Sequence, residues 1–180
     1  NLILDLPGSI NRAVQNRVAQ READYMSYGI FFSLNCIVPY FMWSHIPTEY
    51  LNITLLLRVI AGVLCIGLLM RNYWPIKWKP YFAVYWYFTL LFTLPFLTTF
   101  MLFVSEWESL WFINISIAVF LLSTLTDLVS FIILGILGSY LGSIFTQALT
   151  GQHLTFENIE SVYLLTYILI FSSTIGIVFS

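Results

Sequence analysis

The sequence predicts an all-α integral membrane protein, a bundle of six transmembrane helices with both ends on the cytoplasmic side, preceded by an amphipathic interfacial helix. Hydrophobic residues make up 59% of the 180 residues and charged residues only 9%, against about 25% charged residues in soluble domains. Residues 90–104 and 110–126 carry no charge and are separated only by a short acidic turn. A helix needs about 20 apolar residues to cross a bilayer core, and a helical hairpin satisfies every backbone group in lipid.

The interfacial helix is expected within residues 1–25. After the turn at Pro7-Gly8, Ser9 is a plausible N-cap. Apolar residues then recur every four positions from Ile10 to Val18, and three arginines fall among the polar positions. This pattern fits a helix whose basic groups lie near anionic head groups. A solvated helix that packs on a partner domain is the open alternative.

The membrane domain is expected to occupy residues 26–180, with spans at about 26–44, 51–70, 81–104, 110–125, 128–148 and 161–179. Pro95 should break the third span, where four nearby threonines can bond the carbonyls that the proline frees. Asp127 should cap the fifth span. That span carries a stripe of small residues that allows close helix packing: Gly135, Gly138, Ser139, Gly142 and Ser143. The stripe serves either the bundle itself or a homodimer.

The orientation follows from the basic residues. Six of the seven lysines and arginines lie before the first span or in the loop at residues 71–80, which is also rich in tryptophan and suits an interface anchor. The loops on the other side contain glutamates and no lysine or arginine. By the positive-inside rule the N-terminus is cytoplasmic, and six spans return the chain to the cytoplasm at Ser180.

The sequence contains no nucleophile–base pair, phosphate-binding loop or metal-binding motif. Its two cysteines fall inside apolar spans and its two histidines in separate predicted loops, too few and too scattered for a metal site. We therefore expect no catalytic residue, metal or other cofactor in this chain, and no nucleic-acid partner.

Three residues are candidates for a polar site. A charge inside a span costs at least about 2.5 kcal/mol, so Arg58 should face a cavity or a partner; the alternative is snorkelling to the outer head groups. Trp111 and Asn114 share a face of the fourth span, and an asparagine in lipid needs a hydrogen-bond partner. Alone, Trp111 would suit an aromatic belt at the membrane surface. The three should converge if the second and fourth spans are neighbours.

An apolar slot is expected beside Pro95, where the bent helix lets its neighbours separate. One face of this span carries Phe92, Phe96 and Phe100 at intervals of four residues, and Phe96 and Phe100 are candidates to line the slot. Plain core packing explains the same spacing.

An ordered set of residues between about 39 and 167 resembles a known family. The set comprises Leu57-Arg58, Ala61, Leu64, Gly67, Arg71, Pro75, Lys77-Trp78, Tyr81, Leu94-Pro95-Phe96, Trp107, Trp111 and Thr166-Tyr167. In this order and spacing it resembles the sensory membrane domain of α-hydroxyketone quorum-sensing histidine kinases, the CqsS/LqsS type.

The resemblance implies a receptor in the bacterial inner membrane that binds a long-chain 3-hydroxy- or 3-amino-4-ketone. The signal would set the kinase and phosphatase balance of a dimeric cytoplasmic module after Ser180, and ATP would belong to that module. The implied partners are the amphiphilic ketone, membrane lipids and a second copy of the chain. Matching ligand-binding positions are Trp111, Asn114, Tyr163, Leu165 and Ser173.

Two alternatives stay open, an integral-membrane enzyme or a transporter acting on a lipid-like small molecule. The enzyme would use Arg58 and Asp127, which are expected near opposite faces of the membrane. The transporter would be expected to contain inverted repeats, and residues 26–104 and 110–180 show no such repeat.

Overall fold

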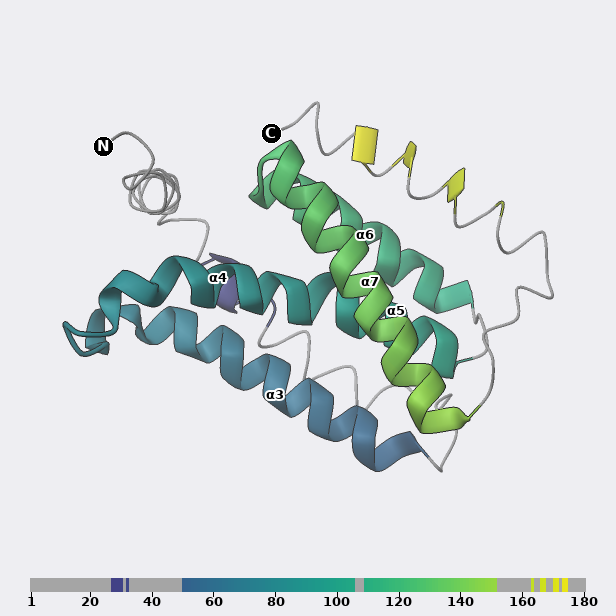
Figure 1. Ribbon diagram of the computed structural model, residues 1–180, viewed down its shortest axis with the longest axis horizontal. Helices are drawn as coiled ribbons and strands as arrows, with labels where there is room; N and C mark the ends of the chain where they lie inside the picture. Colours follow the sequence, from purple (N-terminus) through teal and green to yellow (C-terminus); the bar gives the residue numbers. More distant parts are fainter. Residues whose placement is uncertain are drawn as a thin grey trace, which may run out of the picture.

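The computed structural model describes residues 27–30, 32, 50–105 and 109–151, and residues 163, 166, 167, 170, 171, 173 and 174. Within these residues all regular secondary structure is helical (Figure 1). The interfacial helix expected at residues 1–25, most of the first predicted span, the acidic turn around Trp107, and Leu165 lie outside them.

The second to fifth predicted spans are confirmed as helices, each within two residues of its expected bounds. The elements are α3 (Leu51–Leu69), η3 (Met70–Tyr73), η4 (Lys79–Tyr81), α4 (Phe82–Leu91), η5 (Phe92–Phe96), α5 (Leu97–Val104), α6 (Ser109–Leu125) and α7 (Leu128–Thr150). The elements α4, η5 and α5 form one continuous helical segment that pairs with α3 in a hairpin (Figure 1). Five residues of the first predicted span and seven of the sixth are described, and all of them are helical.

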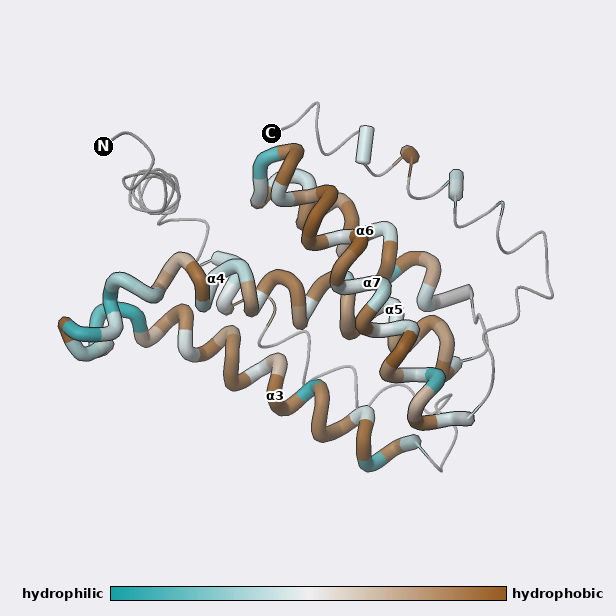
Figure 2. The backbone as a smooth tube through the Cα atoms, viewed as in Figure 1, coloured by the Kyte–Doolittle hydropathy of each residue, from teal (hydrophilic) through white to brown (hydrophobic). Residues whose placement is uncertain are grey.

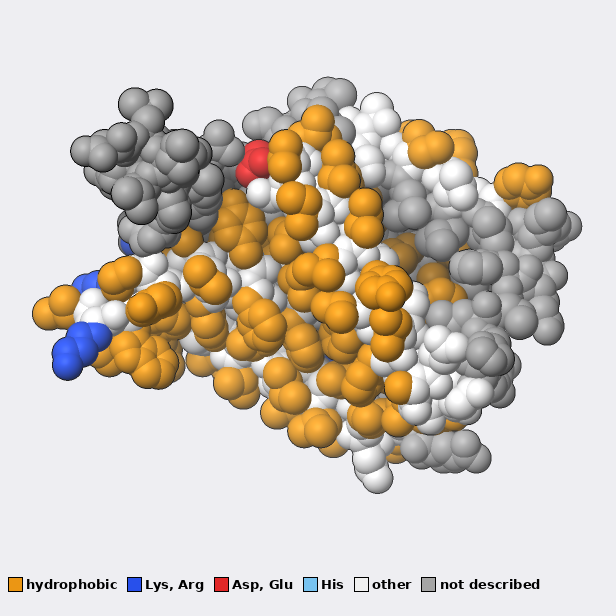
Figure 3. All heavy atoms as spheres, in the orientation of Figure 1, with side chains coloured by type: hydrophobic (Ala, Val, Ile, Leu, Met, Phe, Trp, Pro, Cys, Tyr) orange, Lys and Arg blue, Asp and Glu red, His pale blue; other side chains and the backbone are white. Residues whose placement is uncertain are grey.

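Three helical segments of the described chain are long and apolar enough to cross a membrane: Leu51–Tyr73, Lys79–Val104 and Leu128–Thr150. Trp111–Leu125 is a shorter apolar helix. Figure 2 shows hydrophobic stretches along these helices and a hydrophilic stretch where α3 turns into α4. Apolar side chains also cover the outward faces of α3 and α7, and blue lysine and arginine side chains gather at the tip of the hairpin (Figure 3). Apolar surface on this scale suits contact with lipid.

Pro95 lies in η5, which is a single π-helical turn. In an α-helix its ring would collide with the carbonyl of Leu91, and its nitrogen would donate no hydrogen bond. A π turn is wider and accommodates such an interruption. The expected break at Pro95 is therefore confirmed, as a local widening inside a helix that continues to Val104.

The threonines near Pro95 bond other carbonyls than expected. Thr89 Oγ1 donates to the carbonyl of Tyr85 (2.8 Å), Thr93 Oγ1 to that of Thr89 (2.7 Å) and Thr98 Oγ1 to that of Leu94. None of these bonds reaches Leu91, so the expectation that they satisfy the carbonyl freed by the proline is wrong. Each hydroxyl instead donates to a carbonyl on the preceding turn of the same helical segment.

The first predicted span packs on this segment through Tyr28. The Tyr28 hydroxyl is hydrogen-bonded to Thr93 Oγ1, and because Thr93 donates its proton to Thr89, Tyr28 is the donor. Its ring also meets Trp86 edge-on, with centroids 5.5 Å apart. The π turn is thus braced by an element distant in sequence.

The helix α7 lies close against η5 and α5 because two glycines face them. A Cβ atom at Gly138 would lie 2.4 Å from Cγ of Pro95, and one at Gly142 would lie 2.8 Å from the carbonyl oxygen of Phe96. These two members of the small-residue stripe therefore serve the bundle itself. The ends of α7 follow ordinary capping rules: Asp127 accepts from the backbone N–H of Ser130, as expected, and Gly151 is left-handed with φ 67°.

The two tryptophans in the turn between α3 and α4 have different surroundings. Trp78 is exposed, as an interface anchor requires. Trp74 instead packs inward, where its Nε1 donates to the carbonyl of Gly67 (3.1 Å) and its ring meets Tyr85 edge-on. Only part of this loop therefore matches the anchor interpretation.

Candidate ligand-binding site

A buried cation and a tryptophan meet between α3 and α6. Arg58 is only 4% exposed and Trp111 only 5%, and the guanidinium carbon of Arg58 lies 5.6 Å from the centroid of the Trp111 ring. This distance is within the range of a cation–π contact, which is stronger where water is excluded. The expected convergence of the two residues is confirmed. The snorkelling and aromatic-belt alternatives are wrong, because both side chains point into the bundle.

A third polar residue of this cluster, Thr54, was not anticipated. It lies one helical turn before Arg58 on the same face of α3 and is fully buried. Its Oγ1 makes no hydrogen bond within the structure that is described. Other buried threonines, such as Thr126 and Thr146, donate to the carbonyl four residues earlier. The available sequence signal was a hydroxyl four residues before the only charged residue of the span at residues 51–70.

The helix α6 changes from polar to apolar along one face. Asn114 lies nearly one turn beyond Trp111 and is partly buried. The face that begins with Trp111 continues with buried Ile115, Ala118 and Leu122, at the spacing expected of a single helix face. The helix α6 therefore carries one member of the polar cluster, Trp111, and an apolar wall that begins one turn further on.

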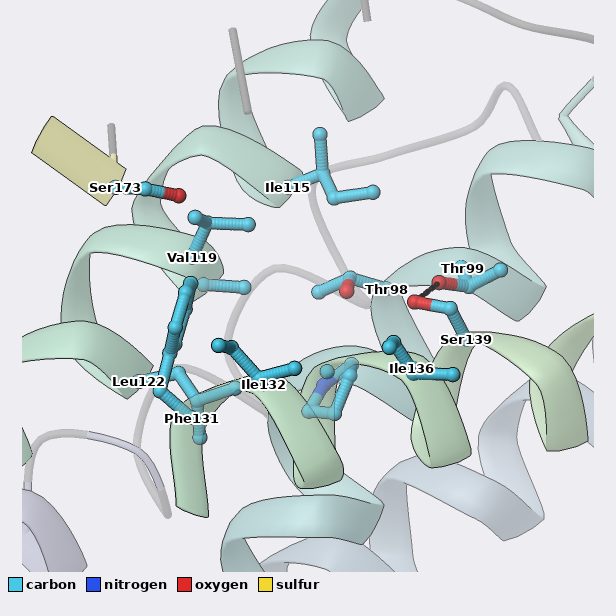
Figure 4. Close-up of a pocket in the computed structure, with 13 residues that line it drawn as sticks. Thr98, Thr99, Ile115, Val119, Leu122, Phe131, Ile132, Ile136, Ser139 and Ser173 are labelled. Carbon is cyan, nitrogen blue, oxygen red and sulfur yellow. Dashed lines mark hydrogen bonds between the residues drawn. The ribbon is translucent and has the colours of Figure 1, made fainter. Parts of the chain in front are cut away.

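That wall borders a cavity of about 370 Å³, within the size range of small-molecule sites. Figure 4 shows side chains of α5, α6 and α7 around it, with Ser173 at its edge. The lining residues are Pro95, Thr98, Thr99, Ile115, Ala118, Val119, Leu122, Phe131, Ile132, Gly135, Ile136, Ser139 and Ser173.

The hydroxyls around the cavity are largely occupied within the protein. Thr99 Oγ1 donates to Ser139 Oγ (3.3 Å), the bond drawn in Figure 4. Thr98 Oγ1 donates to the carbonyl of Leu94. The cavity therefore presents a mainly apolar surface, which suits a hydrocarbon chain better than a polar head group.

The other expected site residues are distributed unevenly. Ser173 lines the cavity, whereas Tyr163 is 68% exposed and does not. Phe96 and Phe100 do not line it either. Their rings pack on Phe145 of α7, at centroid distances of 5.7 and 5.4 Å. The core-packing alternative therefore explains these two phenylalanines, and the slot beside Pro95 has a different wall.

The residues proposed for an enzyme site do not meet. Asp127 follows the far end of α6, roughly 20 Å from Trp111 at 1.5 Å per residue, and both of its carboxylate oxygens accept hydrogen bonds from Ser130. No group of three or more histidine, cysteine, aspartate or glutamate side chains lies together in the described part of the chain. Arg58 and Asp127 therefore do not form one site.

These features define a helical membrane protein with a buried polar cluster and, about one turn along α6 from Trp111, an apolar cavity that Arg58, Trp111 and Asn114 do not line. The chain is 37% identical, over 83 residues, to the CAI-1 autoinducer sensor kinase/phosphatase CqsS of Vibrio cholerae serotype O1. The aligned segment covers 46% of this chain and 12% of that relative. The resemblance to the CqsS type that the motifs suggested is thereby confirmed. No family model matches the chain, and no solved structure matches it.

Proposed function

We propose that this chain is the membrane sensor domain of a quorum-sensing histidine kinase and that its ligand is a long-chain α-hydroxyketone or aminoketone. The observation that carries the proposal is the contact of Arg58 with Trp111, about one turn along α6 from Ile115, which lines an apolar cavity. Relationship to an autoinducer sensor supports it. In this proposal the chain crosses the bacterial inner membrane six times, with both ends in the cytoplasm, and acts as a homodimer.

A linear ketone with an acyl tail requires a narrow apolar slot and a few polar groups at one end. The helix α6 supplies both. Trp111 stands at its polar end, and Leu122, roughly 16 Å further along the axis, belongs to the cavity wall. A ligand aligned with α6 would place its head group near Arg58 and its tail between α5, α6 and α7.

The head group would be held by complementary donors and acceptors. The planar guanidinium of Arg58 can donate to a ketone or hydroxyl oxygen. The Asn114 amide can both donate and accept, so it suits a hydroxyl or an amine. Trp111 would cover the head group and exclude water, which strengthens the hydrogen bonds beneath it.

Signal transmission would start at Ser173. This residue brings the last predicted span to the cavity edge, and the same span leads toward Ser180. If this span can occupy two positions, a ligand that binds more tightly to the cavity in one of them would shift the equilibrium toward that position. We propose that this shift changes the kinase and phosphatase balance of the module after Ser180.

The test is a binding titration of the full chain with 3-hydroxytetradecan-4-one. Arg58→Met should weaken binding roughly 5- to 150-fold, the equivalent of losing a buried hydrogen bond worth about 1–3 kcal/mol. Arg71→Met is the matched control, because Arg71 lies over the Phe82 ring beyond the other end of α3. It should leave affinity unchanged. Equal effects of the two substitutions would remove Arg58 from the site.

A second comparison isolates the head group. Asn114→Leu should weaken binding of the hydroxyketone by the same order and leave binding of tetradecane, which has neither a ketone nor a hydroxyl, nearly unaffected. If the wild-type chain bound tetradecane as tightly as the hydroxyketone, the proposed receptor function would be wrong.

A further inference from the structure

Gly135 is a glycine that neither the backbone nor helix packing requires. It lies within α7, and the only glycine with positive φ in the described residues is Gly151. A Cβ atom at Gly135 would meet nothing within 4 Å, whereas Gly138 and Gly142 are tightly confined by η5 and α5. Glycine is also disfavoured inside a helix relative to alanine. Gly135 does, however, line the cavity.

The open space at Gly135 is part of the cavity volume. Its neighbours on α7, Ile132 and Ile136, also line the cavity, and Ile115 and Val119 form the wall on α6 (Figure 4). Any side chain at position 135 would extend into the space between these walls. Because apolar groups bound this space, a side chain at position 135 would reduce the volume that the cavity offers to a hydrocarbon chain.

We propose that Gly135 sets the length of the linear apolar chain that the cavity accepts. This inference rests on the proposed function, since it treats the cavity as the tail slot of the receptor. A missing side chain at this position leaves room for the far end of a long tail, and a larger side chain would shorten the slot. Short ligands would not reach the affected part and would bind as before.

The test compares ligands of graded length on the full chain in lipid nanodiscs. The probes are 3-hydroxyhexan-4-one, 3-hydroxydecan-4-one and 3-hydroxytetradecan-4-one. Gly135→Leu should weaken the longest ligand about 10-fold or more, the usual effect of removing room for hydrocarbon in an apolar pocket. It should leave the shortest unchanged, and Gly135→Ala should give an intermediate loss.

Ala148→Leu is the control, because Ala148 is an exposed residue of α7 outside the cavity. It should not alter the affinity of any probe. The melting temperature of Gly135→Ala should equal or exceed that of the wild type, since no atom lies within 4 Å of the added Cβ. Equal losses for all three lengths, or no loss for any, would overturn the role of Gly135.

Matched alkan-1-ols separate this inference from the proposed function. If hexan-1-ol, decan-1-ol and tetradecan-1-ol bind as tightly as the ketones and show the same length-dependent loss, the slot is right and the ketone receptor is wrong. If the ketones are preferred and Gly135→Leu acts without regard to length, the receptor stands and Gly135 does not set the length. A copurified phospholipid that no probe displaces would count against both.

Discussion

The contact between α7 and the π turn provides the sharpest test of the fold. Gly138→Ala would place a methyl group 2.4 Å from Cγ and 2.8 Å from Cβ of Pro95. An ordinary contact requires at least about 3.5 Å, so the two helices must separate by roughly 1 Å at this point. The proline ring is rigid and cannot move aside alone. The comparison variant is Gly135→Ala, whose methyl group meets no neighbouring atom.

The magnitude follows from two terms. Overpacking typically costs about 1–3 kcal/mol, while replacing a helical glycine by alanine stabilises by about 0.5–1 kcal/mol. The second term is common to both variants and cancels in their difference. Gly138→Ala should therefore be about 1–3 kcal/mol less stable than Gly135→Ala. For a chain of this length that corresponds to a difference in melting temperature of roughly 2–12 °C.

The assay is thermal unfolding of both variants in the same detergent. Unfolding is followed by circular dichroism or by the reaction of a thiol-specific dye with Cys65, which is buried in the folded chain. Gly142→Ala should behave like Gly138→Ala, because its methyl group would meet the Phe96 carbonyl at 2.8 Å. Equal melting temperatures for Gly135→Ala and Gly138→Ala would refute the packing of α7 on the π turn.

Two further predictions concern a buried hydroxyl and the orientation. Thr54→Val should leave the melting temperature of the ligand-free chain unchanged or raise it, because the Thr54 hydroxyl makes no hydrogen bond among the described residues. Thr93→Val should destabilise by about 1–3 kcal/mol, because it breaks the bonds to Tyr28 and Thr89. A larger loss for Thr54→Val in thermal unfolding would contradict this. With the native cysteines replaced, a cysteine at position 48 should react with an impermeant thiol reagent from outside and one at position 72 should not, and outside labelling at position 72 would exclude the proposed orientation.

Local physics made much of the fold predictable. Runs of apolar residues identified α3, α4–α5, α6 and α7 because a membrane imposes a minimum length of apolar helix. Pro95 marked the irregular turn because a proline lacks a backbone donor. Asp127 marked the start of α7 because its carboxylate satisfies a free N–H of the first turn. Each of these features depends only on neighbouring residues.

The candidate site was predictable only in part. Arg58 was identifiable because a charge in an apolar span is costly, but its contact with Trp111 depends on how α3 approaches α6. Thr54 was overlooked because a threonine in a helix usually bonds its own preceding turn, whereas this hydroxyl makes no hydrogen bond to any described residue. Phe96 and Phe100 have the spacing of a slot wall but pack on Phe145 instead.

The sequence by itself determined that the described part of the chain forms apolar helices suited to a membrane, where these helices begin and end, and where one of them is interrupted. Tertiary structure alone decided which face of each helix points inward. In a span that is apolar all round, hydrophobic periodicity does not separate the buried face from the lipid-facing one. The same glycine stripe therefore contains two residues that hold α7 against η5 and a third, Gly135, that opens onto a cavity, and only the positions of the neighbouring helices distinguish them.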